Sequence, residues 1–250
     1  MLDPTAKKLS VLTLGDSYVS YSGRSVHHPA NFLRIVTYLL LEGRGRAVLR
    51  RRIRDLIWSD SSSEHASADS RQTVARIRRL QEQYNFELVT IEPDMAWLNL
   101  NADVYFDLAD FVQLLAEPKP TDWIRMCEIY NGDLLASLPT VGEGFEEWLA
   151  YQRSAIRYDF ITTIAKAVLP DSELSSRDRY YCATRLLQVD PYHEGAHRAL
   201  MHDAAANGQF SVLRQLFEEC TRRLRTELNV APDEETVLLY RRLISKAPPV

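Results

Sequence analysis

Short β-prone runs and three amphipathic helical patterns occupy the first hundred residues of the chain. Residues 9–14 and 18–21 are β-prone and flank a turn at residues 15–16, which predicts paired strands. Apolar residues at helical spacing predict helices at about residues 29–41, 48–58 and 66–83. Residues 86–91 and 96–100 are typical of a hairpin, with Pro93 and Asp94 in its turn. Strands, three helices and a hairpin in this order are the layout of a winged helix-turn-helix.

The remainder of the chain has an almost wholly helical pattern. Its apolar spacing predicts helices at residues 107–116, 122–130, 144–168, 175–189, 191–207, 210–227 and 233–246. Asp190 followed by Pro191 is typical of a helix cap and a first helical residue. Paired helices joined by short turns indicate a helical-repeat architecture. We therefore expect a mainly α protein, with a winged helix-turn-helix (α+β) domain at residues 8–102 and an all-α domain at residues 103–247.

The two predicted parts differ in charge. The chain as a whole has a formal net charge of −4, with 46% hydrophobic and 26% charged residues. Residues 1–79 contain fourteen Lys or Arg and seven Asp or Glu, a charge of +7. The remaining 171 residues contain 16 basic and 27 acidic side chains, a charge of −11. Only the first part therefore favours a polyanionic partner such as nucleic acid.

The third predicted helix combines an inward face with a basic face. Ser70, Val74 and Ile77 mark the inward face. A helix in the major groove of DNA places arginine against guanine or phosphate. The candidate DNA-binding residues of this helix are Arg71, Gln72, Thr73, Arg76, Arg78 and Arg79. Arg50 and Arg51 begin the second predicted helix and are candidates for contacts with the DNA backbone; a solvated basic face is the alternative for all of these residues.

Motifs in both halves resemble those of one bacterial family. Residues 48–58 (VLRRRIRDLIW) match a second helix that ends in tryptophan, and residues 74–79 (VARIRR) match the core of a recognition helix. Residues 130–135 (YNGDLL), 190–201 (DPYHEGAHRALM) and 227–232 (ELNVAP) match elements of a helical domain. The whole chain resembles the SARP-type transcriptional activators, which join an OmpR-like winged helix to a tetratricopeptide-like bacterial transcriptional activator domain.

The resemblance implies a function and a set of partners. It implies a transcriptional regulator, in this family usually an activator, that binds double-stranded promoter DNA through the helix at residues 66–83 and contacts RNA polymerase. It also implies that two copies pair on repeated sites.

The chain departs from the family at the predicted wing hairpin. Residues 96–97 are Ala-Trp where the family usually has Gly-Tyr, and no Lys or Arg lies between residues 79 and 119. The segment instead carries Glu87, Glu92 and Asp94. A second hypothesis therefore stays open: a protein-interaction regulator whose degenerate winged helix binds a partner regulator rather than DNA.

Residues 193–197 (HEGAH) match the HExxH motif of zinc peptidases, in which two histidines bind metal and the glutamate activates water. Here the motif lies inside the match to a non-enzymatic helical domain. We expect Glu194 to be an acid favoured by the helix dipole, and His197 to pack or cap between helices. The sequence therefore predicts no enzyme, no catalytic residue, no metal site and no cofactor, with zinc catalysis as a distant alternative.

Cysteines and apolar runs bear on the location of the protein. Cys127, Cys182 and Cys220 are odd in number and far apart, which favours free thiols in a reducing cytoplasm over a redox switch. The longest apolar run, residues 35–41, is much shorter than the about 20 residues of a membrane span. The N-terminus lacks the pattern of a signal peptide. We expect a cytoplasmic protein with no membrane partner.

Overall fold

The computed structural model describes residues 8–101 and 103–247, which divide into two compact units. The first unit comprises the residues up to Gln113 together with Ile129–Ile156, and the second comprises Leu114–Glu128 and the residues from Arg157 onward. The described residues are mainly helical, and their strands lie in the first unit. The expected fold class is therefore confirmed. The domain boundary predicted at residues 102 and 103 stays a prediction. Compact units are defined by contacts within the folded chain, whereas the predicted boundary follows the sequence pattern.

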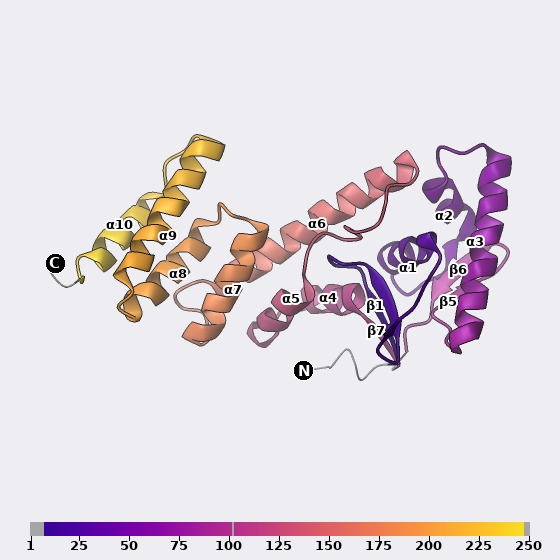
Figure 1. The fold of residues 1–250 in the computed structure, drawn as a ribbon, viewed down its shortest axis with the longest axis horizontal. Helices are drawn as coiled ribbons and strands as arrows, with labels where there is room; N and C mark the ends of the chain where they lie inside the picture. Colours follow the sequence, from indigo (N-terminus) through magenta and orange to yellow (C-terminus); the bar gives the residue numbers. More distant parts are fainter. Residues whose placement is uncertain (1–7, 102, 248–250) are drawn as a thin grey trace. The chain divides into compact units, whose positions relative to one another are not determined.

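A four-stranded sheet near the N-terminus has the strand order β3-β2-β1-β7. Its strands are β1 (Leu9–Leu12), β2 (Tyr18–Tyr21), β3 (Arg24–Ser25) and β7 (Val104–Phe106). β1 pairs antiparallel with β2, and it pairs in parallel with β7, as Figure 1 shows for β1 and β7. The strand pair predicted at residues 9–14 and 18–21 is confirmed. The sequence pattern does not predict β7, because three residues are too few to show an alternation.

Residues distant in sequence hold the turn that follows β1. Asp107 is buried at the start of α4 (Asp107–Ala116) and accepts hydrogen bonds from the backbone N–H groups of Thr13 (2.7 Å) and Leu14 (2.9 Å). The Thr13 hydroxyl donates a third bond, at 2.9 Å. Gly15 has a φ of 97°, and a Cβ atom there would lie 2.9 Å from the carbonyl oxygen of Asn131. A buried carboxyl is tolerated when it is hydrogen-bonded in this way, so Asp107 anchors β1 to the start of α4.

The winged helix-turn-helix consists of three helices and a three-stranded sheet. Its helices are α1 (Ala30–Gly43), α2 (Arg50–Ile57) and α3 (Ser63–Tyr84). Its antiparallel sheet has the order β4-β6-β5, with β4 (Val48–Leu49), β5 (Val89–Ile91) and β6 (Met95–Leu98). α1 contacts both other helices and also β4 and β6, and its Phe32, Leu33 and Val36 are fully buried. The predicted order of strands, helices and hairpin is confirmed.

Two helix starts predicted within the winged helix-turn-helix differ by two or three residues from those in the structure. Val48 and Leu49 form β4 instead of the first turn of the second helix, because they pair with Ala96 and Met95 of β6. α3 begins at Ser63 instead of residue 66, because the Ser62 side chain caps it and accepts a bond from the N–H of His65.

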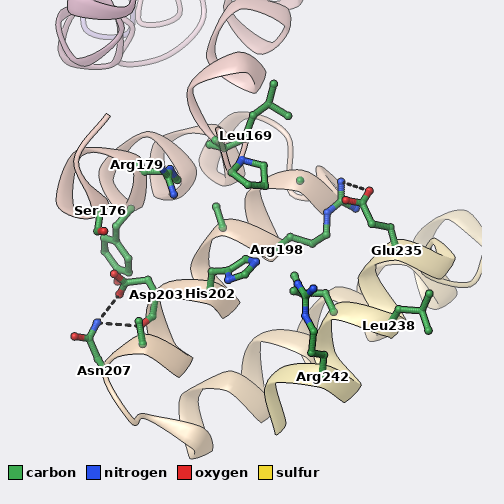
Figure 2. Close-up of a pocket in the computed structure, with 17 residues that line it drawn as sticks. Leu169, Ser176, Arg179, Arg198, His202, Asp203, Asn207, Glu235, Leu238 and Arg242 are labelled. Carbon is green, nitrogen blue, oxygen red and sulfur yellow. Dashed lines mark hydrogen bonds and ion pairs between the residues drawn. The ribbon is translucent and has the colours of Figure 1, made fainter. Parts of the chain in front are cut away.

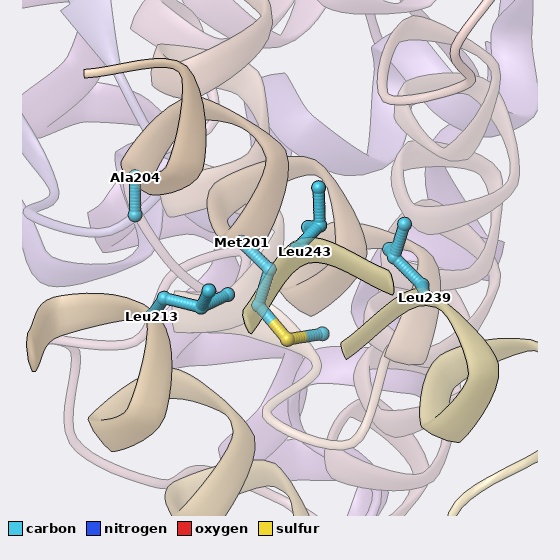
Figure 3. Packing of buried hydrophobic residues seen from close by; sticks show 5 residues of the cluster. All are labelled: Met201, Ala204, Leu213, Leu239 and Leu243. Atoms are coloured by element: carbon cyan, nitrogen blue, oxygen red, sulfur yellow. The ribbon is translucent and has the colours of Figure 1, made fainter. Parts of the chain in front are cut away.

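The rest of the described chain is helical. After α4 come α5 (Trp123–Ile129), α6 (Glu143–Ala167), α7 (Ser176–Val189), α8 (Glu194–Ala206), α9 (Phe210–Arg223), a π-helical turn (Leu224–Leu228) and α10 (Glu234–Ile244). In the second unit α7 packs on α8, and α8 packs on α9 and α10. Figure 3 shows part of the core that results, formed by Met201, Ala204, Leu213, Leu239 and Leu243. Packing between helices that are close in sequence is typical of helical-repeat domains.

The helix cap predicted at Asp190 and Pro191 is wrong. α8 begins at Glu194, and its N-cap is His193, whose Nδ1 accepts a hydrogen bond from the N–H of Ala196 at 3.1 Å. Asp190 is instead the C-cap of α7, and its carboxylate accepts a bond from the N–H of Tyr192 at 3.1 Å. This local turn through Pro191 competes with helix formation, so α8 starts later than predicted.

Candidate nucleic-acid interface

The buried face of α3 fixes the direction in which its arginines point. Ala66, Ser70, Val74, Ile77 and Leu80 of this helix are buried. The predicted inward residues Ser70, Val74 and Ile77 are therefore confirmed. Because these positions lie on one side of the helix, the residues between them face away from the core.

The opposite face of α3 carries most of the predicted DNA-binding residues. Arg71, Gln72, Arg76 and Arg79 are exposed, whereas Thr73 is half-buried. Among the residues that the structure describes, Arg71, Arg76 and Arg79 have no hydrogen-bond or ion-pair partner. Three guanidinium groups on one helix thus keep their donors available for an external acceptor.

A groove of about 530 Å³ lies next to this face. The start of α2 supplies Arg50, Arg51 and Arg54 to its lining, and α3 supplies Arg71. Burial lowers the pKa of Arg50, and the neighbouring charges of Arg78, Arg54 and Arg71 lower it further. Cations held this close repel one another, so a bound phosphate group would relieve the repulsion.

The N-terminus of α2 adds to the positive character of the groove. Its first turn contains no acidic residue, and its N-cap, Leu49, offers no side-chain hydrogen bond. The first N–H groups of a helix and its dipole both favour an anion. The arginines predicted to touch the DNA backbone therefore lie at a helix end that itself attracts phosphate.

Arg78 has a different position from the other arginines of α3. Its Nη2 donates a hydrogen bond of 2.6 Å to the carbonyl oxygen of Ile91 in β5. Arg78 thus joins α3 to the wing, which we define as the hairpin of β5 and β6. Arg78 lies close to Arg50. Its Nη2 already donates a hydrogen bond within the protein, so fewer of its N–H groups can contact DNA.

The sequence pattern does not single out Gln81, which also joins α3 to the wing. This side chain is 8% exposed and accepts hydrogen bonds from the N–H groups of Leu88 (2.9 Å) and Val89 (2.8 Å). Its Nε2 donates to the carbonyl oxygen of Val89 at 2.9 Å. Gln81 is a polar residue that continues the helical spacing of the buried positions 70, 74 and 77. That combination is the signal in the sequence that could have identified it.

The turn of the wing carries acidic side chains and no basic side chain. The turn contains Glu92, Pro93 and Asp94, all exposed. The carbonyl oxygen of Asp94 accepts a hydrogen bond of 2.8 Å from the N–H of Arg50, and Asp94 also lines the basic groove. The carboxylate of Asp94 is therefore placed where it competes with a phosphate for the arginines.

The HExxH motif forms structural contacts at the start of α8. The N-cap role of His193 occupies its Nδ1, and Nε2 of the buried His197 lies 3.1 Å from the carbonyl oxygen of Pro191. The Glu194 carboxylate accepts bonds from the N–H of Asp233 at 2.9 and 3.0 Å, which ties α8 to the start of α10. Within residues 8–101 and 103–247, no three His, Cys, Asp or Glu side chains are grouped as metal ligands.

The cysteines of the described chain are buried thiols. Cys127, Cys182 and Cys220 are free, and the sulfur atoms of Cys127 and Cys182 lie 3.9 Å apart. Burial raises the pKa of Cys220 to about 12. The helices in the described part of the chain also include none with the length and apolar character that a membrane span requires.

Comparisons with known proteins give one family and one fold. The bacterial transcriptional activator domain family matches residues 126–244. A solved structure of Mycobacterium tuberculosis EmbR, in complex with a low-affinity phosphopeptide, is similar with a TM-score of 0.65 and 18% sequence identity. The similarity covers 98% of this chain and 67% of that chain. A comparison with curated proteins gives no match.

Proposed function

We propose that this chain, whose residues 126–244 match the bacterial transcriptional activator domain family, is a SARP-type bacterial transcriptional regulator that binds double-stranded promoter DNA through α3. Transcriptional regulation is the function of the family. The DNA contact, the residues that make it and the partners are what we add.

The observation that carries the proposal is the set of exposed arginines on α3 that lack a partner in the described chain. Arg71, Arg76 and Arg79 share this face with Gln72. Arginine forms paired hydrogen bonds with O6 and N7 of guanine, and glutamine does so with adenine. In a winged helix-turn-helix, such a helix lies in the major groove.

The groove beside α3 gives a second contact. Arg50 and Arg51 lie at the N-terminus of α2, where the helix dipole favours phosphate. We therefore assign the α3 residues Arg71, Gln72, Thr73, Arg76 and Arg79 to the bases and nearby phosphates, and Arg50 and Arg51 to the DNA backbone. Arg78 supports the wing and adds positive charge to the groove.

Activation requires partners besides DNA. We propose that the acidic, helical residues 103–247 contact RNA polymerase, and that two copies pair on repeated promoter sites. Pairing would add avidity to an interface whose wing is acidic.

An electrophoretic mobility shift with promoter fragments from the source genome, repeated over a series of salt concentrations, tests the DNA contact. We expect Arg76→Ala to weaken binding about tenfold, because a lost arginine contact to a base costs about 1–3 kcal/mol. Arg24→Ala is the matched control, since Arg24 is also exposed but lies in β3 of the other sheet. Binding should weaken steeply as salt rises.

The acidic turn of the wing favours a second candidate, a regulator whose winged helix binds a protein. If the intact chain bound no DNA at low salt, this candidate would replace the first. If Arg76→Ala and Arg24→Ala bound DNA equally well, the chain would bind DNA through a surface other than α3.

A further inference from the structure

A cavity of about 1010 Å³ lies within the second compact unit. The residues that follow α6, together with α7, α8 and α10, form its walls (Figure 2). It contains none of the proposed DNA-binding residues, and no part of the HExxH motif other than Gly195 lines it.

Three guanidinium groups reach this cavity from three different helices: Arg179 from α7, Arg198 from α8 and Arg242 from α10 (Figure 2). The charge of Arg198 is compensated, because its Nη2 lies 3.0 Å from a carboxylate oxygen of Glu235. Asp203, the other acid in the lining, accepts a hydrogen bond from Asn207 at 3.2 Å.

The charges of Arg179 and Arg242 are not compensated by an ion pair with any described residue. Arg179 donates from Nε and Nη2 to oxygen atoms of Ser172 and Leu174, all of them neutral groups, at 3.2 to 3.4 Å. Arg242 is exposed, and its guanidinium group has no hydrogen-bond partner within the described chain. Counted over the whole lining, three arginines stand against the carboxylates of Asp203 and Glu235. The cavity therefore keeps free arginine donors and a net charge of +1.

His202 marks the place where these two charges act together. Its pKa is lowered by burial first and then by the charges of Arg242, Arg179 and Lys246. Figure 2 shows its ring among the labelled arginines at the cavity. An anion placed beside His202 would be attracted by every one of these cations.

The cavity also presents uncovered apolar groups. Leu169, Tyr180 and Leu238 line it and are 48%, 49% and 54% exposed. Large apolar side chains at such exposure are unremarkable when scattered, but together on the wall of one cavity they indicate a binding surface.

We propose that this cavity binds a small organic anion: a carboxylate, sulfonate or phosphate attached to an apolar body. The anionic group lies between Arg179 and Arg242, and the apolar body contacts Leu169, Tyr180 and Leu238. The volume matches the upper range of small-ligand sites, about 300–1,000 Å³. The uncompensated charges act at one place, beside His202, which suits a single anionic group better than an extended acidic peptide.

The probe for the test is 8-anilinonaphthalene-1-sulfonate, which joins one sulfonate to an aromatic body. Its neutral counterpart, N-phenyl-1-naphthylamine, has a similar aromatic body without the charge. Fluorescence titration of the full chain should give one saturable site for the sulfonate and much weaker binding of the neutral compound. Arg242→Gln should weaken sulfonate binding about tenfold, because a charge-assisted hydrogen bond is lost.

Two further variants separate the parts of the site. Leu238→Ser should weaken binding of both probes, because it removes part of the apolar wall. Arg214→Gln and Val212→Ser are the controls; both residues are exposed on α9 and lie outside the cavity. The replaced side chains are all exposed, so each variant should keep its helical content. Circular dichroism checks this.

Three results would overturn the proposal. The first is equal affinity for the charged and the neutral probe, since the cavity would then select only for apolar surface. The second is a sulfonate affinity that Arg242→Gln and Leu238→Ser leave unchanged. The third is displacement of the sulfonate by a Glu- and Leu-rich peptide but not by octanoate, which would assign the cavity to a protein partner.

Discussion

Gln81 lies beneath the arginine face of α3 and connects that helix to the wing. Its amide satisfies two backbone N–H groups and one carbonyl oxygen of residues 88–89, where the wing begins. Buried backbone groups that lose such a partner cost about 1–3 kcal/mol each. Gln81 and Arg78 thus both join the wing to α3, and Gln81 holds the end of the wing at residues 88–89.

Replacing Gln81 by leucine should open the wing locally. Leucine fills a similar volume but leaves those three backbone groups without a partner. We therefore expect the free energy of local opening of this segment to fall by about 3 kcal/mol. Hydrogen exchange followed by mass spectrometry on the peptide spanning residues 86–98 measures the effect. Gln83→Leu, at an exposed position of the same helix, should leave the exchange unchanged. Equal protection in both variants would contradict the role assigned to Gln81.

A second residue-scale prediction concerns Asp94. Asp94 lines the groove that contains Arg50 and Arg71, so its negative charge would oppose an incoming phosphate. Asp94→Asn should tighten DNA binding about threefold at low salt, as expected for one exposed charge, and by less at high salt. Asp16→Asn, an exposed acid in the turn after β1, serves as the control. A weaker complex for Asp94→Asn would mean that the acid contributes to DNA binding.

At the scale of elements, α8 combines three histidines with different contacts. His193 caps the helix, His197 is buried and His202 faces the cavity. Burial is the largest cause that lowers the pKa of each one below its usual 6.5. Well above pH 6.5 all three are neutral in both the folded and the unfolded state. As the pH falls through 6.5, the unfolded chain takes up protons that the folded helix resists. The stability of this unit should therefore fall as the pH drops below 6.5.

His193→Asn tests this pH dependence. Asparagine keeps an oxygen that can cap α8 but cannot take up a proton. The difference in thermal unfolding midpoint between pH 7.5 and pH 5.5 should be smaller in this variant than in the parent chain. An unfolding midpoint of the parent chain that was the same or higher at pH 5.5 would refute the prediction.

The elements differ in how far the sequence predicts them. The long apolar periodicity of residues 107–116 predicts α4 with its observed bounds. β4 and β7 escape prediction because they are two and three residues long, and pairing with distant strands creates them. The arginines of α3 are visible as a basic face, but the contact between Arg78 and Ile91 arises only in three dimensions. The cavity in the second unit has no sequence signal, because its lining comes from separate helices.

At the scale of the whole molecule, the chain alternates between its compact units. It leaves the first unit after Gln113, returns at Ile129 and leaves again after Ile156. The returning segment contributes Leu135, whose N–H donates to the carbonyl oxygen of Thr13 at 2.7 Å, and Pro139, whose carbonyl oxygen accepts a bond from the buried Arg34. The winged helix is thus held by residues that follow it in sequence.

The parallel pairing of β1 with β7 bears on how the protein can be divided for experiment. β7 is the outer strand, so a fragment that ends at residue 102 would turn β1 into an unprotected edge. Leu9, Ser10 and Val11 of that strand are buried in the intact chain and carry no charge, and such edges recruit strands from other molecules. We expect a fragment of residues 8–102 to self-associate, and one of residues 8–156 to stay monomeric in sedimentation velocity. A monomeric shorter fragment would show that β7 is dispensable as a cover for the edge. On this prediction β7, which follows the winged helix in sequence, is the strand that keeps the winged-helix region from aggregating.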